Sequence, residues 1–129
     1  MRITSYVLRF ANNCRPNREI VIGNLTTNEL INAEKYWVRC VQKTEFDTGY
    51  EDIKQHKSVT RSSKLFNLNP MLTGYGLLCL GGRLQKSDFK FYEKHPLIIP
   101  TKSRLSQLLT MREHQRLHHS GVSETLITR

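Results

Sequence analysis

Hydrophobic residues in the second half of the chain form two short runs, residues 77–80 and residues 97–99, each bounded by glycine or proline. Runs this short between residues that break helices are typical of buried strands. Gly81 and Gly82 can adopt positive φ without a Cβ clash, which marks a turn or bulge after the first run. The prolines on either side of the second run cannot donate to a ladder, so this run is expected at a sheet edge. The pattern predicts a small antiparallel sheet at about residues 76–100.

The polar and hydrophobic positions before this sheet indicate two helices. Residues 3–11 predict a short amphipathic helix. Its apolar face holds Ile3, Tyr6, Val7 and Phe10. A longer helix begins with a capping box formed by Thr26 and Glu29 and runs to about Glu45. Its expected inward-facing positions, with Trp37 as the largest anchor, are Leu30, Ala33, Trp37 and Val41.

A further helix is expected after the sheet, with Thr101 or Ser103 as its cap and its end at Ser120-Gly121. Its hydrophobic positions are Leu105, Leu108, Leu109 and Leu117. Together these elements predict an α+β fold that is mostly helical, with helices flanking the small antiparallel sheet.

The tripeptide Asp47-Thr48-Gly49 matches the active-site motif of aspartic proteases. Those enzymes place the motif at the end of an apolar strand, whereas here a helical segment precedes it and charged residues follow. We interpret it as a turn that ends the helix, with Gly49 near the C-cap, rather than as half of a protease site.

The chain has 129 residues and a formal charge of +9, with basic residues spread along its length. This length fits one domain, or one domain and part of another. A net positive field attracts phosphate polyanions, which makes nucleic acid the leading partner class. The alternative is that the charge only keeps the surface solvated.

The cysteines Cys14, Cys40 and Cys79 are odd in number and have no paired spacing. We therefore expect buried free thiols in a reducing compartment rather than disulfides. No apolar run reaches the about 20 residues that span a bilayer. Arg9 and Asn12 interrupt the only candidate for the hydrophobic part of a signal peptide. The expected protein is cytoplasmic or nuclear, not secreted, and has no membrane partner.

Histidines cluster where the last helix is expected to end. His114 and His118 are four residues apart, so both imidazoles lie on one helix face and can reach one metal ion. His119 can reach the same ion if it lies past the helix end, so the second ligand stays open. Zinc suits imidazole, but two histidines fill only half of a tetrahedral shell. The alternative is that these side chains are polar surface.

Six segments follow one another along the chain: Tyr-Val-Leu-Arg-Phe-Ala-Asn-Asn-Cys-Arg, Leu-Thr-Thr-Asn-Glu-Leu with Ala33 and Trp37, Leu-Asn-Pro, Gly-Leu-Leu-Cys-Leu-Gly-Gly-Arg-Leu, Lys-His-Pro-Leu-Ile-Ile-Pro and His-x4-His-Ser-Gly-Val. In this order they resemble the Pao/BEL-type LTR retrotransposon polyprotein. The resemblance covers nearly the whole chain. It falls in the stretch that links the RNase H-like region to the integrase, up to the first half of the integrase zinc-binding module.

The resemblance implies that residues 1–100 are a connecting region ahead of the integrase and that residues 101–129 are a truncated zinc-binding domain. It places His114 and His119 at the two histidine positions of a His-His-Cys-Cys site, with His118 as the alternative. Zinc is the cofactor that it implies for the full-length domain. The cysteine pair and the Asp-Asp-Glu core of the family are absent. We therefore expect no stable zinc binding by this chain and no metal-assisted phosphoryl transfer.

Two further positions depart from the family pattern, because Cys79 stands where arginine is common and Thr73 where an acidic residue is common. The function that we expect is that of a non-catalytic integrase fragment associated with DNA integration, with weak, sequence-independent DNA binding. Arg104, Arg112 and Arg116 are the expected phosphate contacts. The alternative is a structural segment that packs against neighbouring polyprotein domains, or self-associates, without touching DNA.

Overall fold

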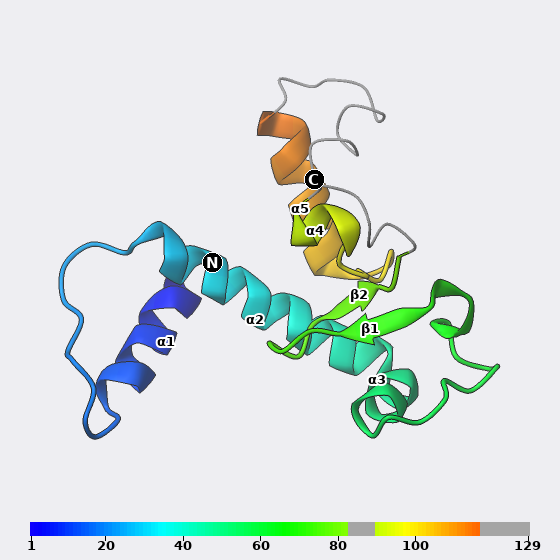
Figure 1. Ribbon diagram of the computed structural model, residues 1–129. Coiled ribbons are helices and arrows are strands. Elements are labelled where there is room, and N and C mark those ends of the chain that lie inside the picture. Colours follow the sequence, from blue (N-terminus) through cyan, green and yellow to red (C-terminus); the bar gives the residue numbers. More distant parts are fainter. Residues whose placement is uncertain (83–89, 117–129) are drawn as a thin grey trace.

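The computed structural model describes residues 1–82 and 90–116 (Figure 1). In chain order the elements are α1 (Arg2–Asn13), α2 (Thr27–Glu45), α3 (Asp47–Lys54), the 3-10 helix η1 (Phe66–Leu68), β1 (Pro70–Leu72), β2 (Leu78–Leu80), α4 (Phe91–Lys94) and α5 (Arg104–Arg116). The mostly helical α+β fold with a small antiparallel sheet is confirmed. Helix α2 forms the long axis of the molecule (Figure 1). Helix α1 lies against the N-terminal half of α2, and the sheet, α3 and α5 lie around the rest of it.

The capping box predicted for α2 is present. The Thr26 hydroxyl accepts from the backbone N–H of Glu29 at 3.3 Å, and the Glu29 carboxylate accepts from the N–H of Thr26 at 2.8 Å. Two of the amides that the first turn leaves without helical partners are thereby satisfied. The helix ends at Glu45, as expected.

The expected inner face of α2 is only partly correct. Ala33, Val38 and Gln42 are the buried positions, whereas Trp37 is 42% exposed. The Trp37 indole N–H donates to the Thr4 hydroxyl of α1 at 2.9 Å. Because the indole N–H needs a polar partner, this bond holds the ring at the surface beside α1. The prediction that Trp37 is the main core anchor is therefore wrong.

The sheet pairs the first predicted run with a segment that the sequence did not identify as a strand. β1 and β2 are antiparallel, with Pro70 opposite Leu80 and Leu72 opposite Leu78. Proline is tolerated here because it is the first residue of its strand. The turn of this hairpin is therefore at residues 73–77, before β2, and not at the paired glycines after it.

The second predicted run lies along the other side of β2, as an edge segment. Cys79 and Leu97 form an isolated antiparallel bridge, and the Ile98 amide donates to the Leu78 carbonyl at 3.0 Å. The Gln42 side chain completes this edge from α2. Its amide NH₂ donates to the carbonyls of Leu78 and Ile98 at 2.9 and 2.7 Å, and its carbonyl accepts from the Leu78 amide at 2.8 Å. A fully buried glutamine thus bridges two backbone segments that a short sheet leaves incompletely paired.

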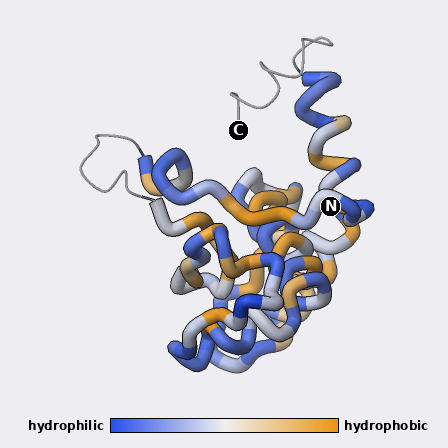
Figure 2. The backbone as a smooth tube through the Cα atoms, turned by 90° about the vertical axis from the view of Figure 1, so that its right-hand side faces the viewer, coloured by the Kyte–Doolittle hydropathy of each residue, from blue (hydrophilic) through white to orange (hydrophobic). Residues whose placement is uncertain are grey.

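The sheet, α3, α5 and the part of α2 that they contact form one unit, which we call the body. Hydrophobic side chains form two clusters in it. One contains Phe46, Tyr50, Leu65, Leu78 and Ile98, and the other contains Val38, Leu77, Leu105 and Leu109. Figure 2 shows the hydrophobic parts of the chain gathered in the middle of the molecule, whereas the far end of α5 is mainly hydrophilic. No residue of α1 belongs to either cluster.

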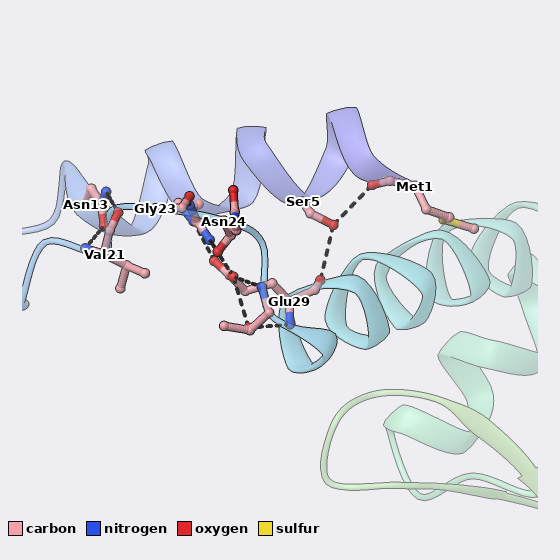
Figure 3. A network of polar contacts seen from close by, with 9 residues as sticks. Met1, Ser5, Asn13, Val21, Gly23, Asn24 and Glu29 are labelled. Atoms are coloured by element: carbon pink, nitrogen blue, oxygen red, sulfur yellow. Dashed lines mark hydrogen bonds and ion pairs between the residues drawn. The ribbon is translucent and has the colours of Figure 1, made fainter.

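Helix α1 presents its polar side to α2 (Figure 3). Its apolar side faces solvent, the opposite of what its pattern predicts for a packed helix. Ser5 and Arg9 are its buried residues, whereas Ile3 is 81% and Phe10 is 70% exposed. The Arg9 guanidinium forms two bonds of 2.6 Å to the Glu29 carboxylate. It also donates to the carbonyls of Gly23 and Asn24 at 2.6 and 2.9 Å. The rigid, planar guanidinium of Arg9 matches the positions of these carboxylate and carbonyl acceptors. The polar side of α1 is therefore the side that is complementary to α2 and the loop before it.

Asp47 is the first residue of α3, and Gly49 lies inside that helix. The prediction of a C-cap at Gly49 is wrong, and packing gives the reason for glycine. A Cβ at this position would lie 2.7 Å from the Ser63 hydroxyl and 2.9 Å from Leu65 Cδ1. Glycine therefore permits the loop before η1 to approach the helix closely. The tripeptide also lacks the preceding strand that an aspartic protease supplies.

Helix α5 begins after Ser103, whose hydroxyl accepts from the Ser106 amide at 3.1 Å, as one of the two predicted caps. Leu105 and Leu109 are buried as expected, but Leu108 is 53% exposed. Leu117 and the predicted helix end lie outside the described residues.

Candidate nucleic-acid interface

The first predicted phosphate contact, Arg112, is held in ion pairs between two helices. Its guanidinium donates to the Glu34 carboxylate of α2 at 2.6 and 3.3 Å and to Glu113 at 3.0 Å. The hydrogen bond to Glu34 is the main cause that raises the pKa of Arg112. This geometry fixes α5 against α2, so a phosphate would have to compete with two carboxylates for Arg112.

The other two predicted contacts lie at opposite ends of α5. Arg116 is exposed and lies 3.5 Å from the buried Glu113 carboxylate, which it shares with Arg112. Arg104 is exposed at the first position of the helix. The structure therefore does not bring the three arginines together into one cationic surface, and their role toward phosphate stays a prediction.

The predicted zinc ligands lie mostly beyond the described chain. His114 is half-buried and lines a cavity of about 550 Å³ with Ile99 and Met111, among others. His118 and His119 lie outside the described residues. Within residues 1–82 and 90–116, no group of three or more His, Cys, Asp or Glu side chains could hold a metal ion. The described residues thus supply a single imidazole of the predicted pair, and the zinc site stays a prediction.

Three basic side chains of α2 line a groove beside this helix. Lys35, Arg39 and Lys43 follow one another at four-residue intervals and line a groove of about 590 Å³. Side chains four residues apart share a helix face and are about 6 Å apart along the axis. None of the described residues that line this groove is acidic. We call this feature the α2 groove.

The opposite wall of the α2 groove is the turn of the β1–β2 hairpin, which the body holds in place. Gly76 has a φ of +71°, which glycine adopts without strain. Its carbonyl accepts from the Tyr50 hydroxyl at 2.8 Å, and the Tyr75 carbonyl accepts from Arg39 at 3.2 Å. A Cβ on Gly76 would lie 3.1 Å from the Tyr50 hydroxyl oxygen. The turn is therefore positioned by close contacts to α3 and α2.

Tyrosine rings lie between the cations of the α2 groove. The Lys35 ammonium lies 5.1 Å from the centre of the Tyr75 ring, and the Lys43 ammonium lies 5.5 Å from that of Tyr50. Both distances are within the range of cation–π attraction. Burial raises the pKa of the Tyr50 phenol, so it stays protonated near neutral pH and keeps its donor to the turn. The groove therefore combines fixed positive charge with aromatic surface.

The sequence contained part of the evidence for the α2 groove. The spacing of its three cations on a helix with a clear capping box places them on one face. That Tyr75 joins them could not be deduced, because this residue reaches α2 only through the hairpin and its contacts.

The cysteine and membrane predictions are tested in part. The three cysteines are free, and Cys79 is buried, where desolvation raises the pKa of its thiol. Cys14 is exposed, so the expectation of buried thiols is wrong for this residue. Among the described helices, none has the length and apolar character required to cross a bilayer.

Comparisons of the chain with protein-family models, with curated proteins and with solved structures found no match. The resemblance to the retrotransposon polyprotein therefore stays a prediction.

Proposed function

We propose that this chain is a non-catalytic, sequence-independent nucleic-acid-binding segment of a Pao/BEL-type retrotransposon polyprotein, associated with DNA integration. The observation that carries the binding function is the α2 groove, in which Lys35, Arg39 and Lys43 line one surface without an acidic neighbour among its described lining. The formal charge of +9 adds a long-range attraction for polyanions. The α5 arginines Arg104, Arg112 and Arg116 are secondary contacts in this proposal.

Phosphate binding by lysine and arginine releases counterions, so the affinity must fall as salt rises. Titration of fluorescently labelled DNA by anisotropy, over a series of salt concentrations, measures this dependence. The Lys35→Ala/Lys43→Ala variant should weaken binding and reduce the salt slope by roughly 1.4 to 1.8, at about 0.7 to 0.9 per phosphate contact. Lys57→Ala/Lys102→Ala is the matched control, because it removes two exposed lysines outside the groove lining.

Binding that does not weaken with salt would contradict this proposal, as would no binding at low salt. An equal loss of affinity in the control variant would show that only net charge matters and that the α2 groove is not the site.

A second candidate function, self-association without DNA contact, is favoured by the outer face of α1. Ile3, Val7 and Phe10 are 81%, 58% and 70% exposed, and Ile20 and Ile22 in the following loop are 71% and 85% exposed. Exposed apolar surface of this kind is typical of protein interaction sites. If this function holds, sedimentation of the wild-type chain depends on concentration, and Val7→Ser/Phe10→Ser sediments as a monomer at all concentrations.

A further inference from the structure

We infer that the α2 groove binds a single-stranded polynucleotide, with a base stacked on Tyr75 and the backbone along Lys35, Arg39 and Lys43. This inference rests on the proposed function, and it specifies which form of nucleic acid the groove takes. It depends on the exposure and fixed attachment of the Tyr75 ring, on the spacing of the cations along α2, and on the position of the ring among those cations.

Tyr75 is an aromatic side chain displayed at a fixed position. It is 70% exposed although the Lys35 ammonium lies over its ring. Its backbone is held by the bond from Arg39 to its own carbonyl and by the bond from Tyr50 to the next carbonyl. The ring surface is thus largely open while its attachment is constrained. Such a ring stacks on a base of any identity, because every base has a π-face.

The cations lie where the backbone of a bound strand would run. Lys35, Arg39 and Lys43 repeat about every 6 Å along α2, a spacing comparable with that between successive phosphates of an extended strand. Lys35 and Arg39 both contact Tyr75, so the positive charge begins at the stacking position and continues along the helix to Lys43. Tyr36 also lines the groove and is 38% exposed, which gives a second aromatic surface one helical position from Lys35.

The position of the ring among the cations favours a single strand over a duplex. Bases in a duplex are stacked on one another and present only their edges in the grooves. A base that stacks on Tyr75 must leave this stack, which costs less in a single strand because no base pair has to be broken. A duplex can bring phosphates to Lys43 but cannot place a base face on Tyr75. Single-stranded DNA and single-stranded RNA share the chemistry that the groove recognises.

The test compares labelled oligonucleotides of roughly 12 nucleotides, a length within the site sizes of single-strand-binding domains. Oligodeoxythymidine, oligouridine and a duplex of equal length are titrated by anisotropy at one low salt concentration. Tighter binding of the single strands than of the duplex is expected. A preference for one of the two single strands identifies whether DNA or RNA is the natural source of the ligand.

Tyr75→Leu should lower the affinity for the single strands roughly 10-fold, the loss of one base–aromatic stack, and leave duplex affinity unchanged. Tyr75→Phe should bind as the wild type does, because it keeps the π-face. Tyr6→Leu is the control, since Tyr6 is an exposed tyrosine on α1 outside the groove lining. Circular dichroism verifies that Tyr75→Leu is folded, which its exposure favours.

The inference is overturned if the duplex binds as tightly as the single strands, or if Tyr75→Leu binds them as the wild type does. In that case a salt-dependent loss in Lys35→Ala/Lys43→Ala would still support the proposed function. If no oligonucleotide binds at low salt, both the inference and the proposed function are wrong.

Discussion

Two regions of this molecule are stabilised by different kinds of interaction: the N-terminal half, where α1 packs against α2, and the body around the sheet. In the N-terminal half, α1 joins α2 through Ser5, Arg9 and Glu29 (Figure 3). The apolar side of α1 is left in solvent. In the body, leucines such as Leu65 and Leu78 are fully buried in clusters that connect α3, the sheet and α5. Figure 1 shows both regions along the single helix α2.

This difference shows that hydrophobic periodicity identifies a helix without determining which side of it packs inward. Hydrophobic burial is non-directional and tolerates small changes of geometry, so the body depends on volume and shape. The α1–α2 contact depends on the ion pair between Arg9 and Glu29 and on the four hydrogen bonds that the Arg9 guanidinium donates in fixed directions. It should therefore respond to pH and to single polar substitutions, whereas the body should respond to changes of side-chain size.

The largest effect should come from the body. Leu78→Ala removes a fully buried side chain and leaves a cavity, and it should lower the free energy of unfolding by about 3–5 kcal/mol. Leu108→Ala is the matched control, because this leucine of α5 is 53% exposed, and its effect should stay within about 0.5 kcal/mol. Urea unfolding followed by circular dichroism measures both. Equal effects of the two substitutions would contradict the assignment of the core.

A smaller effect should come from Gln42, a buried polar side chain that bridges two backbone segments of the body. Gln42→Leu keeps a similar volume but removes the partners of the Leu78 amide and the Ile98 carbonyl. Leaving buried backbone groups unpaired should destabilise the protein by roughly 1–3 kcal/mol. Gln107→Leu, at an exposed position of α5, is the control. Stability equal to that of the wild type would show that the body, unlike the α1–α2 contact, does not need its polar bonds.

The smallest effect should be the pH dependence of the α1–α2 contact. Hydrogen bonds lower the pKa of Glu29 from 4.5 to about 2, with the bond from the Arg9 side chain as the largest cause and the bond from the Thr26 backbone amide as the second. Because the folded pKa lies below the unfolded one, the stabilisation is fully present above about pH 4.5 and is lost as the pH falls toward 2. Emission of Trp37, the single tryptophan, reports this loss because its indole donates to Thr4 of α1.

Glu29→Gln provides the comparison for this titration, because it cannot ionise. Above pH 4.5 the wild type should be the more stable of the two, and the difference should vanish near pH 2. A difference that stays constant over this range would mean that the charge of Glu29 does not hold α1 in place.

Local rules in the sequence were sufficient for part of the fold. The capping box at Thr26 and the end at Glu45 define α2 through contacts within one helix. The glycine- and proline-bounded runs predict strand β2 and its edge segment, both of which the structure contains. The strand at residues 70–72 was missed, because a run of three residues with proline at its start carries too little pattern to identify it.

The candidate site was predictable only where it depends on one element. The interval between Lys35, Arg39 and Lys43 places three cations on one face of α2 whatever packs around them. The α5 arginines were equally visible in the sequence, but the pairing of Arg112 with Glu34 depends on how α5 lies against α2.

Local spacing and composition are enough to predict the helices with strong periodicity, strand β2 with its edge segment, and a positive charge that favours polyanions. Three features follow only from the folded arrangement: α1 packs through Arg9, Trp37 stays at the surface, and Tyr75 faces cations of α2. Each of these depends on a partner distant along the chain. Complementarity between such partners is a property of their arrangement in space, which spacing along one segment does not contain.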